Sequence, residues 1–341
     1  MKRGKRREAR GEKKNMKERT TLWLLATLFL ANVSFADAQQ TGKIFRIGFL
    51  DTSTASGSAV LWDAFRQEMR KLGWIEGKNI AIEYRFAEQK PERLPELAVD
   101  LVRLKVGLIV VSGTPPALAA KNATTAIPIV MANVADPVGQ GLVASLARPG
   151  GNVTGNSGLA FELDTKRLEI LKDVVPKLAR VGFLRLPSGS NSQLKEIRPA
   201  AVALKLKLEE IETQADAKGL ESAFQTAKQK QVGAIMTTTS RIFFAERKRI
   251  VELAGKYRFP AIYSQDEFVE VGGLMSYGAD YDDLYRRTAV YVDKILKGAK
   301  PADLPVQQAT KFEFVINLKA AKQIGLTISP DLLARANKVI K

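Results

Sequence analysis

Two polar segments, each following a short apolar run, are the residues whose types and spacing suggest chemistry. The run LIVV breaks into Ser112-Gly113-Thr114-Pro115-Pro116, and IPIVMA breaks into Asn133-Val134-Ala135-Asp136-Pro137. Thr114 and Asp136 each precede a proline, the pattern of a helix N-cap followed by proline at the first helical position. In an open α/β sheet, ligands bind at the carboxyl ends of strands, and helix starts favour a carboxylate or phosphate. The sequence therefore predicts a ligand site at Ser112, Thr114, Pro115 and Asp136.

Three further polar side chains are expected near the same edge. Ser53 and Thr54 follow the first predicted strand in the loop DTSTASGS, and Tyr277 follows a later strand, where its ring could stack on a ligand. Each has a plain structural alternative: a solvent-exposed loop for the hydroxyls and packing at a hinge for Tyr277. Thr114 and Asp136 could equally serve only their own helices. For Trp62 and Trp74, packing is the preferred interpretation over sugar stacking.

The composition narrows the chemistry that this chain can perform. It has 341 residues, 45% of them hydrophobic, which is enough for a large core in two lobes. It contains no cysteine and no histidine. Disulfides, cysteine nucleophiles, thiolate metal sites and every Ser-His or His-metal arrangement are therefore excluded. We expect no metal and no cofactor, and an enzyme would depend on carboxylates, Lys, Tyr or Ser.

The first 38 residues read as a targeting segment. The basic run MKRGKRREARGEKKNMKERT precedes the apolar TLWLLATLFLANVSF, and Ala36-Asp37-Ala38 provides a small-x-small cleavage pattern. We predict export to the periplasm with cleavage after Ala38; an uncleaved N-terminal anchor is the alternative. Met16 is a plausible true start, because MKERTTLWLL is itself a compact n-region. This segment holds part of the formal net charge of +17, and the remaining basic residues are interleaved with acids, so no nucleic-acid partner is expected.

From Lys43 onward, short apolar strands alternate with longer amphipathic helices, and the alternation restarts near Val181. This order predicts two doubly wound parallel sheets. Predicted strands in the first half are Arg46–Asp51, Ile80–Phe86, Leu108–Ser112, Ile129–Ala132 and Asn152–Gly155, with helices Val60–Leu72, Glu92–Leu104, Pro116–Lys121 and Val138–Leu146. In the second half the strands are Val181–Leu186, Leu208–Glu212, Ala234–Thr237, Ala261–Tyr263 and Leu274–Tyr277, with helices Leu163–Val175, Gln193–Leu206, Leu220–Gln229, Ile242–Tyr257 and Tyr281–Leu296. A strand and two helices complete residues 311–341.

Two such lobes, joined by a few crossings, form a cleft that closes around a small molecule like a hinge. The predicted crossings are Gly155–Gly158, Gly278–Asp280 and Lys300–Pro305. We accordingly predict a first lobe of residues 43–157 completed by about 279–302, and a second lobe of 158–278 completed by about 305–341. The fold class is α/β, with two doubly wound parallel-sheet lobes joined by a hinge.

Six ordered motifs resemble one family. They are IGFL at 47–50, LGWIEGKNI at 72–80, VVSGTPPALAAK at 110–121, IPIVMANVADPVGQGLVASLARPGGNVTG at 127–155, FVEVGGLMSYGADYDDL at 268–284 and KFEFVINLKAAKQIGL at 311–326. In these the chain resembles the periplasmic substrate-binding proteins of ABC transporters, in the family that includes tryptophan- and tyrosine-binding members. The resemblance covers residues 43–341.

The resemblance implies a type I two-lobe binder, expected to be a monomer, that delivers a small carboxylate-bearing solute, an amino acid or similar, to an inner-membrane permease. A separate ATPase would drive that permease, and the chain has no GxxxxGK[ST] loop of its own. The ligand-binding candidates gain Thr238 and Thr239 from this resemblance. Amino-acid-binding relatives carry an Asp-Asn pair where this chain has Thr238-Thr239-Ser240, so the acid that would meet an α-ammonium is missing.

Two other classes share parts of this pattern. A ligand-sensing domain for a membrane receptor has the same fold, and neighbouring permease and ATPase genes would favour uptake instead. An exported glycoside hydrolase would need two carboxyl groups at a fixed separation, such as Asp136 with Asp266 or Glu267. We expect a binding protein and no enzyme.

Overall fold

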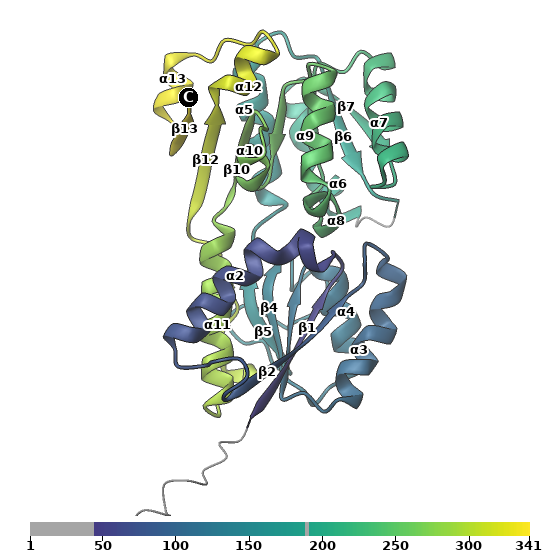
Figure 1. The fold of residues 1–341 in the computed structure, drawn as a ribbon. Coiled ribbons are helices and arrows are strands. Elements are labelled where there is room, and N and C mark those ends of the chain that lie inside the picture. The colour runs from purple at the N-terminus through teal and green to yellow at the C-terminus, as the bar shows by residue number, and fades with distance from the viewer. Residues whose placement is uncertain (1–43, 188–190) are drawn as a thin grey trace, which may run out of the picture. The chain divides into compact units, whose positions relative to one another are not determined.

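The computed structural model describes residues 44–187 and 191–341. The predicted signal peptide and its cleavage site lie outside these described residues. Two sheets organise the chain, each in its own lobe, as Figure 1 shows. The predicted α/β fold with two parallel-sheet lobes is confirmed. Within the described residues, no helix combines the length and apolar character needed to cross a bilayer.

The first sheet has the order β11-β5-β4-β3-β1-β2, and all its pairs are parallel. Its strands are β1 (Phe45–Asp51), β2 (Ile80–Phe86), β3 (Leu108–Ser112), β4 (Ile129–Val134), β5 (Val153–Ser157) and β11 (Gln307–Gln308). Its helices are α2 (Ala55–Lys71), α3 (Leu94–Arg103), α4 (Thr114–Ala123) and α11 (Tyr281–Leu296), with short 3-10 turns η1 (Pro91–Arg93) and η2 (Pro301–Asp303). Because parallel strands end at one edge, the loops after β1, β3 and β4 lie together.

The second sheet has the order β13-β12-β10-β9-β8-β6-β7, in which only the β10–β12 pair is antiparallel. Its strands are β6 (Arg180–Arg185), β7 (Lys207–Glu212), β8 (Ala234–Thr237), β9 (Ala261–Tyr263), β10 (Met275–Ala279), β12 (Phe312–Asn317) and β13 (Lys338–Ile340). Its helices are α5 (Glu162–Val174), α6 (Asn191–Ala203), α7 (Ala217–Gln229), α8 (Arg241–Ala245), α9 (Arg247–Lys256), α10 (Glu267–Glu270), α12 (Leu318–Gln323) and α13 (Pro330–Ala334).

Apolar side chains of the strands point alternately to the two faces of each sheet. In β1, Ile47 and Phe49 join the core under α2 and α11, whereas Leu50 joins the core under α3 and α4. The second sheet has one core against α5 and α6 and another against α7 and α9. The core under α2 and that under α9 form one continuous cluster, so the two lobes are in contact.

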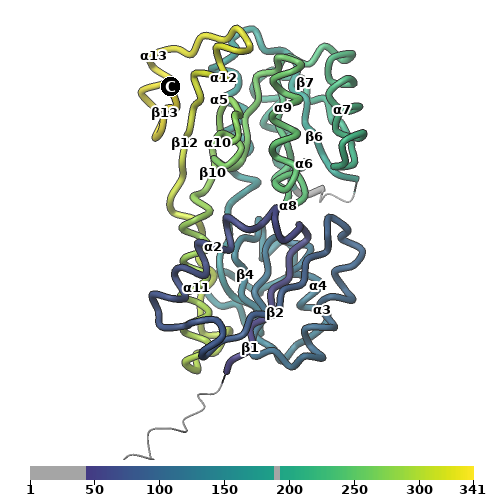
Figure 2. The backbone as a smooth tube through the Cα atoms, in the orientation of Figure 1, coloured from purple at the N-terminus to yellow at the C-terminus, as the bar shows by residue number. Residues whose placement is uncertain are grey.

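The chain passes between the sheets after β5, after β10 and before β12. Figure 2 follows the backbone from β10 into α11 and later back into β12. The third passage lies at 309–311 and not at the predicted Lys300–Pro305, because Gln307 and Gln308 pair with β5 in the first sheet. Lobe 1 therefore keeps residues up to Gln308.

Three local predictions need correction. The predicted helix Val138–Leu146 is absent: this segment is a series of turns, in which Gly141 has a φ of 66° that ends any helical run. The predicted helix Ile242–Tyr257 is divided into α8 and α9 at Glu246. The C-terminus adds a short strand, β13, beside β12.

Trp62 and Trp74 pack as expected. Trp62 is buried against Phe49 and Tyr285, with ring centroids 3.6 and 4.8 Å away. Trp74 lies edge-on to Phe45, and its Nε1 donates to Asp293 Oδ1 at 2.9 Å. Neither ring lines the cavity described next.

Candidate functional site

A cavity of about 450 Å³ lies between the carboxyl ends of the two sheets. The first lobe contributes Thr52 after β1, the start of α4, and Asn133 at the end of β4. The second lobe contributes residues after β6, the segment from Thr238 to Ile242 after β8, and Gln265 after β9. Both sheets thus present their strand ends to one enclosed space, the arrangement expected of a ligand site.

The start of α4 forms part of this wall, but not in the predicted manner. The cap residue is Gly113, with a φ of 90°, and Thr114 is the first helical residue, so Thr114 is not the N-cap. Pro115 and Pro116 have no N–H, and Ala117 N donates to Gly113 O at 3.3 Å. This helix start therefore has fewer backbone donors for an anion than the sequence suggested.

Asp136 also has a different role from the predicted helix cap. Its Oδ1 accepts from Gly139 N at 2.8 Å, which closes a single turn. No helix follows this turn, so Asp136 is not a helix cap. It does not line the cavity, although Ala135 and Gln140 beside it do.

Of the predicted ligand-binding residues, the structure brings four to the cavity wall: Thr114, Pro115, Thr238 and Thr239. Thr54 caps α2 by accepting from Gly57 N at 3.0 Å, and Ser112 Oγ lies 2.6 Å from Tyr285 Oη behind the wall. Ser53 is buried, with its N–H donating to Asp51 Oδ1.

Tyr277 lies outside the cavity lining. Its ring packs edge-on against Phe314 at 6.3 Å, and its carbonyl oxygen accepts from Arg167 Nε at 2.7 Å. The structure thus gives Tyr277 the packing role that was the alternative to stacking on a ligand.

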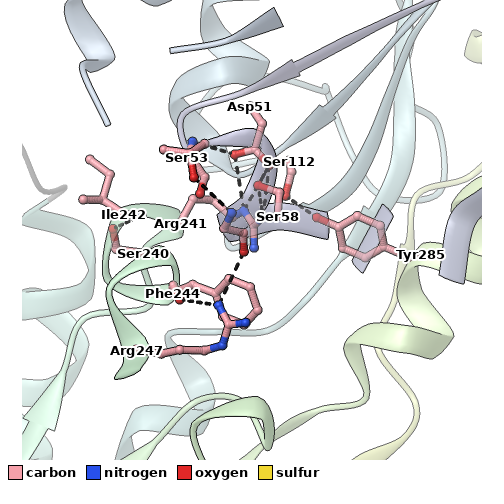
Figure 3. A network of polar contacts seen from close by, with 12 residues as sticks. Asp51, Ser53, Ser58, Ser112, Ser240, Arg241, Ile242, Phe244, Arg247 and Tyr285 are labelled. Atoms are coloured by element: carbon pink, nitrogen blue, oxygen red, sulfur yellow. Dashed lines mark hydrogen bonds and ion pairs between the residues drawn. The ribbon is translucent and has the colours of Figure 1, made fainter. Parts of the chain in front are cut away.

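An ion pair joins the two lobes beside the cavity, as Figure 3 shows. Arg241, the first residue of α8, extends to Asp51 at the end of β1. Its Nη2 lies 3.0 Å from Asp51 Oδ2 and 2.9 Å from Ser58 Oγ, while Nε lies 3.3 Å from both carboxylate oxygens. Ser58 Oγ also donates to Asp51 Oδ2 at 2.9 Å, and Ser53 N donates to Oδ1.

This pair is buried on both sides, with Asp51 fully enclosed and Arg241 9% exposed. The Asp51 carboxylate raises the pKa of Arg241 against the opposing effect of burial, which is the largest single influence. Two buried charges are stable only when their hydrogen bonds are satisfied. Asp51 meets that condition with donors from Arg241, Ser58 and Ser53.

A second buried network lies behind the opposite wall. Gln193, which lines the cavity, donates through Nε2 to Asp164 Oδ2, and Arg167 Nη1 donates to Asp164 Oδ1. Burial raises the pKa of Asp164, opposed chiefly by the Arg167 charge. Burial also raises the pKa of Tyr281, another lining residue, while Arg167 and Asn133 act in the opposite direction. These contacts fix Gln193 and Tyr281 in place.

Five lining residues carry a buried polar atom that has no hydrogen-bond partner in the structure. They are Thr52 Oγ1, Asn133 Oδ1, Thr239 Oγ1, Arg241 Nη1 and Gln265 Nε2. A buried polar atom without a partner costs about 1–3 kcal/mol, so such atoms are rare and each calls for an explanation. Other such atoms lie elsewhere in the described residues, but these five surround one cavity at the strand ends of both sheets, which makes it the candidate site.

Gly158, at the first passage between the lobes, lies against a lining residue of the cavity. A Cβ built on Gly158 would lie 2.0 Å from Asn133 Oδ1. A larger residue there would therefore displace the Asn133 side chain from its present position.

The carboxylates proposed for a hydrolase are not arranged around this cavity: Asp136, Asp266 and Glu267 are all absent from its lining. Glu267 is buried, and this burial together with the neighbouring Asp266 raises its pKa to about 8. Within the described part of the chain, no cluster of three or more acidic side chains could hold a metal ion.

Sequence reasoning missed Arg241, Gln193, Gln265 and Tyr281. Gln265 follows β9 by two residues and Arg241 follows β8 by four, at the edge where ligands bind, so their position was a usable signal. The partner of Arg241 was not readable, because Asp51 lies 190 positions away.

Comparison with known proteins gives consistent matches. A family described as "ABC transporter substrate binding protein" matches residues 57–340. A tyrosine-binding protein of Clostridioides difficile (strain R20291) is 31% identical over 267 residues, which is 77% of this chain and 75% of that protein.

Solved structures show the same likeness over 87% of this chain. A conserved domain protein from Vibrio cholerae, matched over its whole length, has a TM-score of 0.81 at 29% identity. An ABC domain in complex with L-Trp from Streptococcus pneumoniae, also matched over its whole length, has a TM-score of 0.78 at 28% identity. A ligand-free, open substrate-binding protein from Clostridium difficile, matched over 99% of its length, has a TM-score of 0.61 at 26% identity.

Proposed function

Because this chain belongs to the family of ABC transporter substrate-binding proteins, we propose that it captures a small carboxylate-bearing solute in the cavity between its lobes by hinge closure. The observation that carries the proposal is the cavity itself, into whose walls both sheets bring buried polar atoms without partners. A bound solute offsets the cost of those atoms.

Hinge closure is supported by the comparison of structures. At nearly equal identity, this chain superposes better on the structure with bound L-Trp than on the ligand-free, open one. The contact between Arg241 and Asp51 exists only while the lobes are together. A ligand that touches both walls favours this closed state by its contacts to the second lobe.

The proposal includes the role of the chain in a transport system. The exported protein would begin at Gln39 in the periplasm and hand its solute to an inner-membrane permease driven by a separate ATPase. The chain would act as a monomer and release the solute unchanged, since no carboxylate lines the cavity among the described residues.

Thermal unfolding with a panel of amino acids and organic acids tests solute binding. A solute at a hundred times its Kd contributes about 2.7 kcal/mol and should raise Tm by about 5–10 °C. Native mass spectrometry of freshly purified protein identifies a retained solute. Chemical conversion of a bound solute would contradict the proposal.

A pair of tryptophan substitutions tests the location of the site. Leu118→Trp, on the α4 wall of the cavity, should abolish the ligand-induced rise in Tm by filling the space. Val202→Trp, at a 75% exposed position of α6, is the control and should leave the rise unchanged. Retained binding in Leu118→Trp would place the ligand elsewhere.

A further inference from the structure

The charges around the cavity are of one sign. Among the described residues its lining includes Arg185 and Arg241 but no aspartate or glutamate. A cationic ligand buried there would have no counter-charge, and an unpaired buried charge is strongly unfavourable. An anionic ligand would instead meet guanidinium groups, of which Arg185 also pairs with Glu212 at 2.8 Å and Arg241 with Asp51 at 3.0 Å.

The acids nearest to the lining are not available to a cation. Asp51 already accepts from Arg241, Ser58 and Ser53 N. Asp164 is enclosed and bonded to Arg167 and Gln193. Each is therefore neutralised or satisfied by the protein itself.

Glu267 is the remaining buried acid close to Arg241 and Tyr281. With a pKa of about 8 from its burial and from Asp266, it holds a proton at neutral pH. A protonated carboxyl group offers no negative charge to an ammonium.

Arg241 has one donor to spare. Nε and Nη2 contact Asp51 and Ser58, but Nη1 has no partner although the residue is nine-tenths buried. Its side chain passes Gly113, where a Cβ would lie 3.5 Å from Arg241 Cγ, and Arg241 and Gly113 both line the cavity. A carboxylate is the strongest partner for a guanidinium N–H.

The rest of the wall is apolar or uncharged. Leu118, Phe161, Leu186, Leu194 and Ile242 provide apolar surface, and Gln265 and Thr239 provide polar groups without charge. Such a wall suits the hydrocarbon body of a small acid.

We propose that the solute is an organic acid with an apolar body and no α-ammonium group, and that Arg241 binds its carboxylate through Nη1. This inference rests on the proposed function and specifies its substrate class. It predicts that removing the amino group from a candidate amino acid improves binding.

Matched pairs of solutes test this directly in thermal unfolding and calorimetry. The probes are L-phenylalanine with 3-phenylpropanoate, and L-leucine with 4-methylpentanoate, each also compared with the amide of the acid. The deaminated acid should bind at least tenfold more tightly than both its amino acid and its amide. An amino acid that binds as tightly as its partner, an amide that binds better than the acid, or no binding by either acid overturns the inference.

Variants of the ion pair test the role of Arg241. Arg241→Gln keeps a hydrogen-bonding side chain and should weaken acid binding at least tenfold, with no change for the amide. Arg249→Gln, on the α9 surface where Arg249 pairs with Glu221 and Glu252, is the matched control. Arg241→Gln leaves the buried Asp51 carboxylate without its counter-charge. The double variant Asp51→Asn with Arg241→Gln removes that carboxylate and should bind the acid as weakly as Arg241→Gln alone.

The outcomes separate this inference from the proposed function. Full acid binding by the double variant would mean that Arg241 acts only by neutralising Asp51, which overturns the inference. An amino acid retained in native mass spectrometry would also overturn it, yet would support the proposed function, whereas a retained polyol would contradict both. Conversion of any solute to a product would instead contradict the proposed function.

Discussion

Gly57 lies at a close contact between the two lobes, and adding one methyl group there should hold them apart. Gly57 is in the first turn of α2 and faces Ala245 of α8. A Cβ at Gly57 would lie 2.8 Å from Ala245 Cβ, whereas carbon atoms in contact prefer about 3.5–4.0 Å. The Ser53 hydroxyl at 2.9 Å can rotate away and Thr54 Oγ1 can shift slightly while keeping its cap bond to Gly57 N, but the Ala245 methyl group cannot rotate away.

Gly57→Ala should therefore require the lobes to separate by roughly 1 Å. Overpacking of this kind costs about 1–3 kcal/mol, which lowers the closed population and the ligand affinity by about 5- to 150-fold. The folded lobe itself should not suffer, because alanine is better than glycine in a helix by about 0.5–1 kcal/mol. Affinity and stability should thus move in opposite directions.

Gly255→Ala provides the control, since Gly255 lies in α9 with no atom within 4 Å of the added Cβ. It should gain about 0.5 kcal/mol of stability and keep wild-type affinity. Calorimetry measures the affinity, and small-angle scattering should show a larger radius of gyration for ligand-free Gly57→Ala. Equal affinity and equal radius in both variants would refute the reasoning.

Three further predictions concern charge. Asp51→Asn leaves Arg241 buried without its counter-charge and should lower the free energy of unfolding in urea by about 3–5 kcal/mol; a loss under 1 kcal/mol would contradict this. The pKa of Glu267 is about 8 in the folded chain and about 4.5 when unfolded, so the free energy of unfolding should fall as pH rises between these values. Glu267→Gln should remove that fall when Tm is measured across this pH range. Glu270→Gln, at an exposed position, is the control and should leave the fall unchanged. Thr239→Asp restores an acid to the cavity wall and should raise affinity for amino acids over their deaminated forms, measured by calorimetry; unchanged preference would show that this position does not meet the ligand.

Most of the regular strands and helices could be predicted from the local pattern of apolar and polar residues. The bounds of Ile80–Phe86, Leu108–Ser112 and Ala234–Thr237 were predicted as the structure has them. The last two are buried parallel strands, which appear as apolar runs that end at a polar residue. Ile80–Phe86 is a half-buried edge strand in which charged residues alternate with apolar or aromatic ones. The prediction of a helix at Val138–Leu146 was wrong because of a glycine. The apolar residues of VGQGLVASL have helical spacing, yet Gly141 adopts a left-handed conformation that ends a helix.

The candidate site was only half readable from sequence. Thr114 and Thr239 reached the cavity because each follows a strand at the ligand-binding edge. Tyr277 was expected just after a strand, but it lies inside β10 (Met275–Ala279), where Phe314 of the neighbouring β12 packs edge-on against its ring. Which strand-end residue faces the cavity depends on its neighbours in the sheet, and those come from distant parts of the chain.

The sequence by itself determined the two-lobe α/β fold and the edge at which a ligand binds, since both follow from short-range periodicity and helix-start chemistry. It also excluded thiol and imidazole chemistry by composition. Tertiary structure alone decided that Arg241 meets Asp51 across 190 positions, that Gly57 meets Ala245, and that no acid lines the cavity among the described residues. These features depend on residues far apart in the sequence, and their energies depend on burial and on distances that no local pattern encodes.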